Sequence, residues 1–97
     1  MNITRSTGNN KPLRWLLYID SPKEPSILTG HSLSLVITDS LDADTTVSGT
    51  LYSGDAGVYF DVPDTVYDVA GTYTYKLNDT DTNADVLTVD TGTIVYS

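Results

Sequence analysis

The segment Asp68-Val69-Ala70-Gly71-Thr72-Tyr73 constrains the fold more than any other part of this sequence. A tyrosine that follows a sharp turn at the start of an alternating stretch is typical of a tyrosine corner. In such a corner the phenol hydroxyl bonds to the backbone a few residues upstream and fixes the crossover between two sheets. The segment therefore predicts a β-sandwich in which Asp68, Gly71 and Tyr73 form the corner.

Short stretches of alternating apolar and polar residues recur along the chain and are separated by turn residues. They predict strands at 14–20, 32–38, 47–52, 58–62, 72–77, 86–89 and 93–96. Two prolines within 21–25 are expected to prevent pairing there, and Gly92 is expected to form a bulge. No stretch has a convincing 3.6-residue apolar period, so we expect little or no helix. The predicted fold is an all-β, immunoglobulin-like antiparallel sandwich of about seven strands.

Residues 1–12 are polar and contain a flexible Gly-Asn-Asn-Lys-Pro segment. A stretch of this kind buries too little apolar area to order itself alone. We therefore expect a flexible, extended N-terminal arm over 1–12 and a sandwich domain over 13–97. If the arm contacts another protein, Arg5, Lys11 and Pro12 are the residues expected to do so.

The charge of the chain excludes some classes of partner. The formal net charge is −8, and four of the five basic residues lie within the first 23. Binding of nucleic acid normally needs a basic face, so neither nucleic acid nor an anionic membrane is an expected partner. The chain has no cysteine, which excludes disulfides and thiolate metal sites. The first residues lack the apolar core of a signal peptide, so synthesis and release in a cytoplasm are expected.

Little in the sequence points to catalysis. His31 is the only histidine, and its neighbour Ser32 would point to the opposite face of a strand. We therefore predict no enzymatic activity, no catalytic residue and no cofactor. The acidic positions of 79–90 fit an EF-hand loop in part, but Ala84 stands where such a loop needs glycine. No metal site is predicted there or in the acidic stretch 39–44, although calcium remains an alternative for both.

The outward phase of three strands places tyrosines on the surface. Tyr18, Tyr52 and Tyr59 are candidates for a contact surface or for a platform that stacks on sugars. Trp15 alternates with Leu13 and Leu17 instead, which predicts that it lies in the core.

Three segments together resemble a known kind of protein. They are 57–63 (Gly-Val-Tyr-Phe-Asp-Val-Pro), 70–75 (Ala-Gly-Thr-Tyr-Thr-Tyr) and 87–95 (Leu-Thr-Val-Asp-Thr-Gly-Thr-Ile-Val). Their order is similar to that of the small immunoglobulin-like virion modules of tailed bacteriophages, including the N-terminal domain of baseplate upper proteins. The likeness covers about residues 13–96.

The resemblance implies a non-enzymatic virion protein that assembles in the host cytoplasm. Because no receptor-binding part follows Ser97, we expect a capsid decoration or cement protein that is docked by its N-terminal arm. Its partner would be the major capsid protein or another virion protein, and a homo-oligomer such as a trimer is compatible with this role. The alternative is a tail or baseplate module, or an adhesion module that binds a host glycan or protein.

Overall fold

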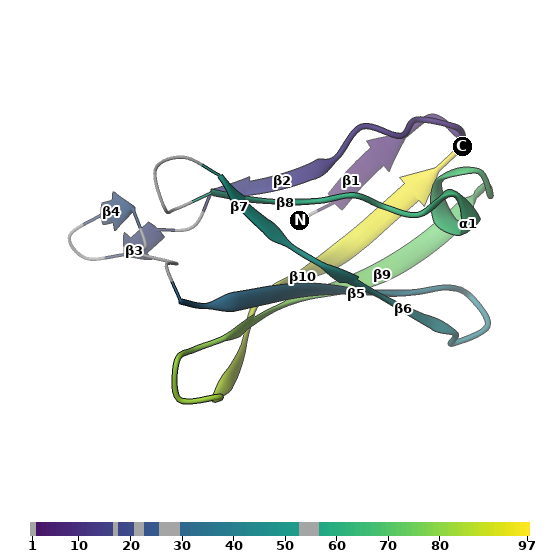
Figure 1. Ribbon diagram of the computed structural model, residues 1–97. Coiled ribbons are helices and arrows are strands. Elements are labelled where there is room, and N and C mark those ends of the chain that lie inside the picture. Colours follow the sequence, from purple (N-terminus) through teal and green to yellow (C-terminus); the bar gives the residue numbers. More distant parts are fainter. Residues whose placement is uncertain (1, 17, 21–22, 26–29, 53–56) are drawn as a thin grey trace.

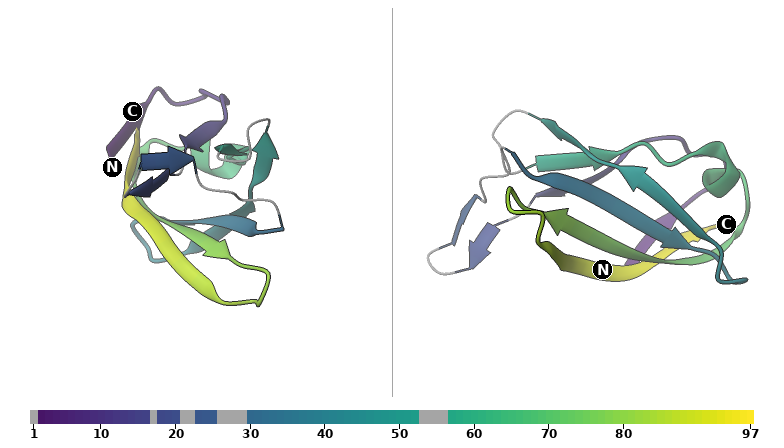
Figure 2. Two further views of the ribbon diagram at one scale, coloured as in Figure 1. Left: turned by 90° about the vertical axis from the view of Figure 1, so that its left-hand side faces the viewer. Right: turned by 60° about the horizontal axis from the view of Figure 1, so that its bottom comes forward.

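The fold is a sandwich of two β-sheets with a small hairpin at one end (Figures 1 and 2). A computed structural model describes residues 2–16, 18–20, 23–25, 30–52 and 57–97. The larger sheet has the order β1 (Asn2–Arg5), β10 (Val86–Tyr96), β9 (Gly71–Thr80), β5 (Ser32–Thr38) and β6 (Asp44–Ser48). The smaller sheet has the order β2 (Leu13–Leu16), β8 (Gly57–Phe60) and β7 (Thr50–Tyr52). The hairpin consists of β3 (Tyr18–Asp20) and β4 (Lys23–Pro25), and one short helix, α1 (Asp64–Tyr67), precedes β9.

The strand order confirms the predicted class of fold. In immunoglobulin-like domains one sheet contains strands C, F and G and the other contains B, E and D. Here β5, β9 and β10 take the first three places, and β2, β8 and β7 take the other three. The one parallel pair involves a strand outside the predicted sandwich domain: β1 runs parallel to β10 and makes the larger sheet a mixed one.

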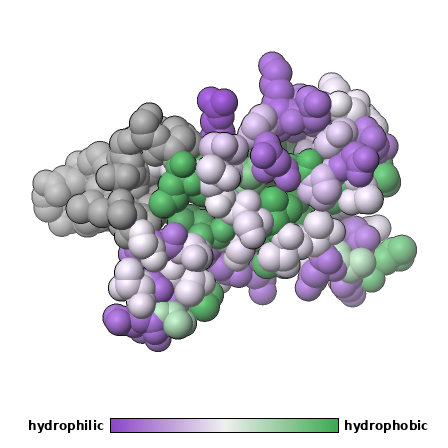
Figure 3. Space-filling view, in the orientation of Figure 1, coloured by the Kyte–Doolittle hydropathy of each residue, from purple (hydrophilic) through white to green (hydrophobic). Residues whose placement is uncertain are grey.

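The core lies between the two sheets and is built by alternation along the strands. Leu33, Leu35 and Ile37 are buried on β5, and the outward residues between them are only half-buried. In the view of Figure 3, hydrophobic side chains gather in a band between hydrophilic ones above and below. The buried set also includes Leu13, Trp15, Val58, Phe60, Val62, Val66, Tyr73, Tyr75, Leu77, Ile94 and Tyr96. These positions confirm the inward phases predicted for 32–38, 58–62 and 72–77.

The chain changes sheets at Gly49, within a stretch that alternation predicts to be a single strand. Residues 44–48 pair with β5 in the larger sheet, whereas 50–52 pair with β8 in the smaller one. A Cβ at Gly49 would lie only 2.7 Å from Cγ2 of Val58 and 2.8 Å from Cε1 of Phe60. Gly49 is therefore the residue that allows the chain to cross this close to the core.

The N-terminal segment is part of the sandwich, so the prediction of a flexible arm over 1–12 is wrong for the residues described. Asn2 pairs with Thr93 and Arg5 pairs with Tyr96, and Ile3 packs against the core. The backbone N–H of Gly8 then donates to the carbonyl of Tyr67 at 2.7 Å. The segment can be polar and still form an edge strand, because its backbone makes the hydrogen bonds to β10 and only Ile3 needs to face the core.

Two further differences concern strand ends. The proline-containing stretch pairs after all, since Tyr18 lies opposite Pro25 and Asp20 opposite Lys23; proline is compatible with an edge strand. The two strands expected at 86–89 and 93–96 form one strand, β10. Its irregularity lies between Thr88 and Asp90, not at the predicted Gly92.

Deleting residues 1–5 should destabilise the domain. The deletion removes the pairing of β1 and the packing of Ile3, so we expect the free energy of unfolding to fall by roughly 2 kcal/mol or more. Urea denaturation measures the change. The variant Thr4→Ala is the control, because it alters only an exposed side chain of the same strand. Equal stability of the deletion variant and the intact chain would contradict the role assigned to β1.

Candidate functional site

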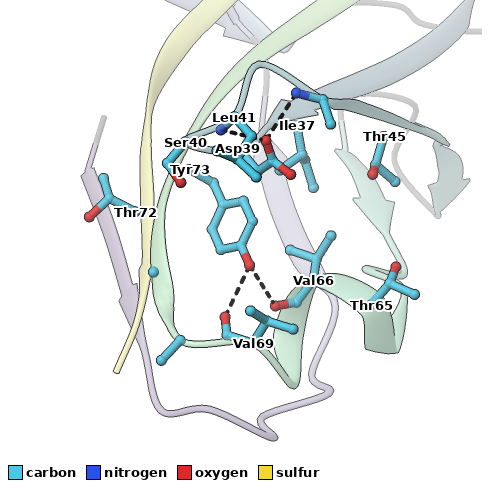
Figure 4. Close-up of a pocket in the computed structure, with 13 residues that line it drawn as sticks. Ile37, Asp39, Ser40, Leu41, Thr45, Thr65, Val66, Val69, Thr72 and Tyr73 are labelled. Carbon is cyan, nitrogen blue, oxygen red and sulfur yellow. Dashed lines mark hydrogen bonds between the residues drawn. The ribbon is translucent and has the colours of Figure 1, made fainter.

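The tyrosine corner forms as predicted. The hydroxyl of Tyr73 donates to the carbonyl of Val69 at 3.0 Å and lies 3.3 Å from that of Val66 (Figure 4). Asp68 serves the corner through its backbone, since its N–H donates to the carbonyl of Asp64 and ends α1. Gly71 begins β9, where an added Cβ would meet only Tyr73 at an ordinary 4.0 Å. Burial, and to a lesser extent the charge of Asp39, raises the pKa of Tyr73.

A hollow of about 400 Å³ opens beside this corner, at the end of the sandwich that carries α1 and the turn between β5 and β6. Figure 4 shows the ring of Tyr73 on one side of the hollow and Thr45 and Thr65 on the other. Two apolar side chains at its rim are exposed to solvent, Leu41 by 87% and Val69 by 53%. A leucine this fully exposed, next to a concave surface, distinguishes this end as a candidate contact site.

Acidic residues adjoin the lining of this candidate site in sequence, and together they are termed its acidic rim. Asp42 and Asp44 stand next to the lining residue Ala43, at the turn and the start of β6, while Asp64 and Asp68 lie on and just after α1, next to the lining residues Thr65 and Val69. All four are exposed. An apolar centre with a charged, solvated rim is the usual anatomy of a protein contact, and a partner would need basic groups around its own apolar centre.

Two of the aspartates considered for calcium shape turns instead. Oδ1 of Asp39 accepts the backbone N–H groups of Leu41 and Ala43, at 2.8 and 2.9 Å. Oδ1 of Asp81 accepts those of Asn83 and Asp85 in the same way, at 2.8 and 3.0 Å. Such side-chain-to-backbone bonds are the reason aspartate favours turns. Within the described residues, no three acidic, histidine or cysteine side chains gather into a set that would hold a metal ion.

A polar cluster around the partly buried Asp90 joins the two sheets. The indole N–H of Trp15, on β2, donates to Oδ2 of Asp90 at 2.9 Å, and the hydroxyl of Tyr75, on β9, donates to the same oxygen at 2.7 Å. The rings of Trp15 and Tyr75 lie 5.5 Å apart. Trp15 also packs edge-on against Phe60, at 5.6 Å. The core position predicted for Trp15 is confirmed, and Tyr75 is buried as well.

The hydrogen bonds around Asp90 determine its charge state. Burial raises the pKa of its carboxyl, but bonds from Tyr75, Trp15 and the backbone of Thr91 outweigh burial and leave the pKa below its usual range. Burial and the bond to Asp90 together raise the pKa of Tyr75 well above its usual range. At neutral pH the cluster therefore contains a carboxylate that accepts bonds from two neutral aromatic donors.

Of the remaining candidate residues, the three of the predicted arm contact one another. The Nη1 of Arg5 donates to the carbonyl of Lys11 at 3.0 Å, and its Nη2 lies 3.4 Å from the carbonyl of Pro12. Tyr59 is half-buried on β8. The side chains of Tyr18 and Tyr52 lie outside the described part of the structure, although the backbones place them on the hairpin and on β7.

His31 contacts an acidic side chain rather than a serine. Its Nδ1 lies 2.8 Å from Oδ1 of Asp79, and both side chains are partly exposed. The pair connects the residue before β5 to the C-terminal half of β9. The one histidine of the chain therefore contributes a contact between neighbouring strands.

The sequence reasoning missed Asp90 and Leu41, although each left a signal. Asp90 shares the inward phase of Ile94 and Tyr96, and a charge on a core-facing position calls for buried donors. Leu41 is a lone apolar residue in an acidic turn.

No helix among the described residues combines the length and apolar character needed to cross a membrane. Comparisons with protein-family models, with curated proteins and with solved structures found no match.

Three tyrosine-to-phenylalanine variants should separate bonded from unbonded hydroxyls in the core. Tyr73→Phe loses the corner bonds and should lower the free energy of unfolding by about 1 kcal/mol, and Tyr75→Phe loses a bond to a charged acceptor and should lower it by about 1.5–3 kcal/mol. The hydroxyl of Tyr96 is buried without a partner, so Tyr96→Phe should leave stability unchanged or raise it. Urea unfolding of all three measures this order, and a loss in Tyr96→Phe as large as in Tyr73→Phe would contradict it.

The low pKa of Asp90 predicts an acid-sensitive contribution to stability. Because the pKa is lower in the folded state, the carboxylate stabilises the fold above the unfolded pKa of about 3.9, and this stabilisation is lost as pH falls through the lower folded value. Asp90→Asn should be less stable at neutral pH and should lose less stability on acidification. Asp61→Asn, which changes an exposed acid, is the control. Denaturation across about pH 7 to pH 2 tests this, and parallel curves for the intact chain and Asp90→Asn would refute it.

Proposed function

We propose that the protein is a non-enzymatic structural module of a tailed-phage virion that decorates the capsid through the Leu41 end of the sandwich. The observation that carries the proposed contact is the 87% exposure of Leu41 beside the hollow at the tyrosine corner. Exposed apolar side chains at a concave surface are characteristic of protein contacts, where a few such anchors supply most of the binding energy.

Support for the virion role comes from the three segments that carry the resemblance. They fall on β8 of the smaller sheet and on the corner, β9 and β10 of the larger one, so the likeness extends over strands of both sheets. The side chains considered for chemistry also have structural partners: Asp39 and Asp81 bind turn backbones, Asp90 binds core aromatics, and His31 meets Asp79. These roles favour a scaffold over an enzyme.

The docking element proposed here differs from a free N-terminal arm. Arg5 is bound to the chain at Lys11 and Pro12, and β1 is paired within the larger sheet. Leu41 and Val69 instead offer an apolar centre inside an acidic rim, so the complementary surface on the major capsid protein would be an apolar depression with basic surroundings. Contacts of this kind weaken as salt screens the rim charges, and many copies on one shell compensate for weak single contacts.

The location is tested by a gold-labelled antibody against the protein on intact purified virions of the phage that encodes it. Label distributed over the head is the expected result. Label confined to the tail would favour the baseplate alternative, and label at neither place would overturn the virion proposal and leave adhesion to a host glycan or protein.

The contact surface is tested by one substitution. Leu41→Asp should reduce binding of the purified protein to virions that lack it by at least tenfold, because a charge replaces the apolar anchor. Thr46→Asp adds the same charge at an exposed position on β6 and should bind as the intact chain does. Equal binding of Leu41→Asp and the intact chain would exclude this end as the contact.

A further inference from the structure

Half of strand β10 has a neighbour on one side only. β1 pairs with Thr93 to Tyr96, whereas Val86 to Thr88 pair with β9 alone among the described residues. This half of the strand lies in the β9–β10 hairpin, which projects from the body of the sandwich (Figure 2, left). A strand edge without a neighbour offers backbone N–H and C=O groups to another strand.

The side chains of this edge are apolar and exposed. Val86 is exposed by 63%, Leu87 by 66% and Val89 by 36%. Because the hairpin reaches beyond the sandwich, consecutive residues are exposed on both faces of the strand. The two valines and the leucine are thus exposed apolar side chains divided between the two faces of the hairpin, and they are distinct from Leu41 and Val69.

Three other edge strands of the sandwich carry charged residues of the kind that natural proteins use to prevent edge pairing, and the fourth, β7, is only three residues long. Arg14 lies on edge strand β2, Asp44 on edge strand β6 and Arg5 on β1. The one charged residue of β10 is Asp90, and its carboxylate binds Trp15 and Tyr75. The stretch Val86–Val89 is therefore an edge without charge in a chain of net charge −8.

We propose that two copies of this chain associate by antiparallel pairing of their Val86–Thr88 edges about a twofold axis at Leu87, which sets Leu87 opposite its own copy. Twofold pairing sets a strand against its own copy, and like charges directly opposite each other are destabilising. An uncharged stretch of strand meets this requirement in an acidic protein. A different protein that recognised this edge by its charge would need charged residues on the edge. The edge is also continuous with the part of β10 that already accepts β1.

The short edge and the net charge define how this association should behave. Few backbone bonds and a small apolar area predict a weak, concentration-dependent dimer. The two bodies repel each other, so salt should strengthen the association as the Debye length falls from about 10 Å at 0.1 M to about 3 Å at 1 M. This is the opposite of the salt response expected for the acidic Leu41 end, and the inference does not depend on the virion role.

Sedimentation equilibrium of the purified chain tests the proposal. We expect a dimer fraction that rises with protein concentration and with salt between about 0.1 M and 1 M. Leu87→Asp should remain monomeric, because it places like charges across the axis. Leu41→Asp is the matched control, with the same change at an exposed leucine far from this edge, and should dimerise as the intact chain does. Thermal unfolding verifies that both variants fold.

A charge pair distinguishes twofold self-pairing from non-specific clustering of exposed apolar side chains. Leu87→Lys alone should be monomeric, but an equimolar mixture of Leu87→Asp and Leu87→Lys should restore association, because opposite charges then face each other. A monomeric intact chain at every concentration and salt level, or an unrestored mixture, would overturn the proposal. In either case the unpaired edge would instead be available for pairing with a strand from a different protein.

Discussion

The contact of Trp15 and Tyr75 with Asp90 is the interaction on which the sandwich depends most. Antibody domains join strands B and F with a disulfide, and its second cysteine lies two residues after the corner tyrosine. Tyr75 lies two residues after Tyr73, and Trp15 is on the strand in the B position. A hydrogen bond to a charged acceptor contributes about 1.5–3 kcal/mol, and a lost disulfide costs about 2–5 kcal/mol. The bond from Trp15 to Asp90 crosses between the sheets, whereas the bond from Tyr75 holds the same carboxylate in place from within the larger sheet. The link between the sheets therefore overlaps the lower part of the disulfide range, and it is insensitive to reducing conditions.

At one end of the sandwich, backbone hydrogen bonds tie the N-terminal segment to the C-terminus and to α1. The N–H of Thr7 donates to the carbonyl of Ser97 at 3.0 Å, and that of Ser97 to the carbonyl of Arg5. Gly8 reaches Tyr67 on α1, next to the corner that Tyr73 holds. The segment after β1, the C-terminus and the tyrosine corner thus belong to one end of the molecule (Figure 1). That end is anchored well enough to present Leu41 and Val69 on a rigid support, which a specific contact requires.

Local patterns predicted the parts of the fold that local physics decides. The corner around Tyr73 and the strand 32–38 follow from spacing and alternation alone, and the structure reproduces them. The position of β1 depends on pairing with residues about ninety positions away, which no local pattern encodes. Alternation also continues smoothly across Gly49, so it cannot show that the chain changes sheets there. Leu41 at the candidate site and Asp90 in the cluster with Trp15 and Tyr75 were visible as exceptions to pattern, but their roles depend on side chains from distant strands.

A protein that works by assembly needs contacts that do not compete with one another. Leu41 lies at the corner end, whereas Val86 and Leu87 begin β10 at the hairpin that projects from the opposite half of the larger sheet. The first surface is apolar with an acidic rim, and the second is apolar without charge, so each selects a different kind of partner. A single small domain with both could hold a shell through one surface and a neighbouring copy through the other. Weak contacts of two kinds then reinforce each other, since each bound copy raises the local concentration of the next.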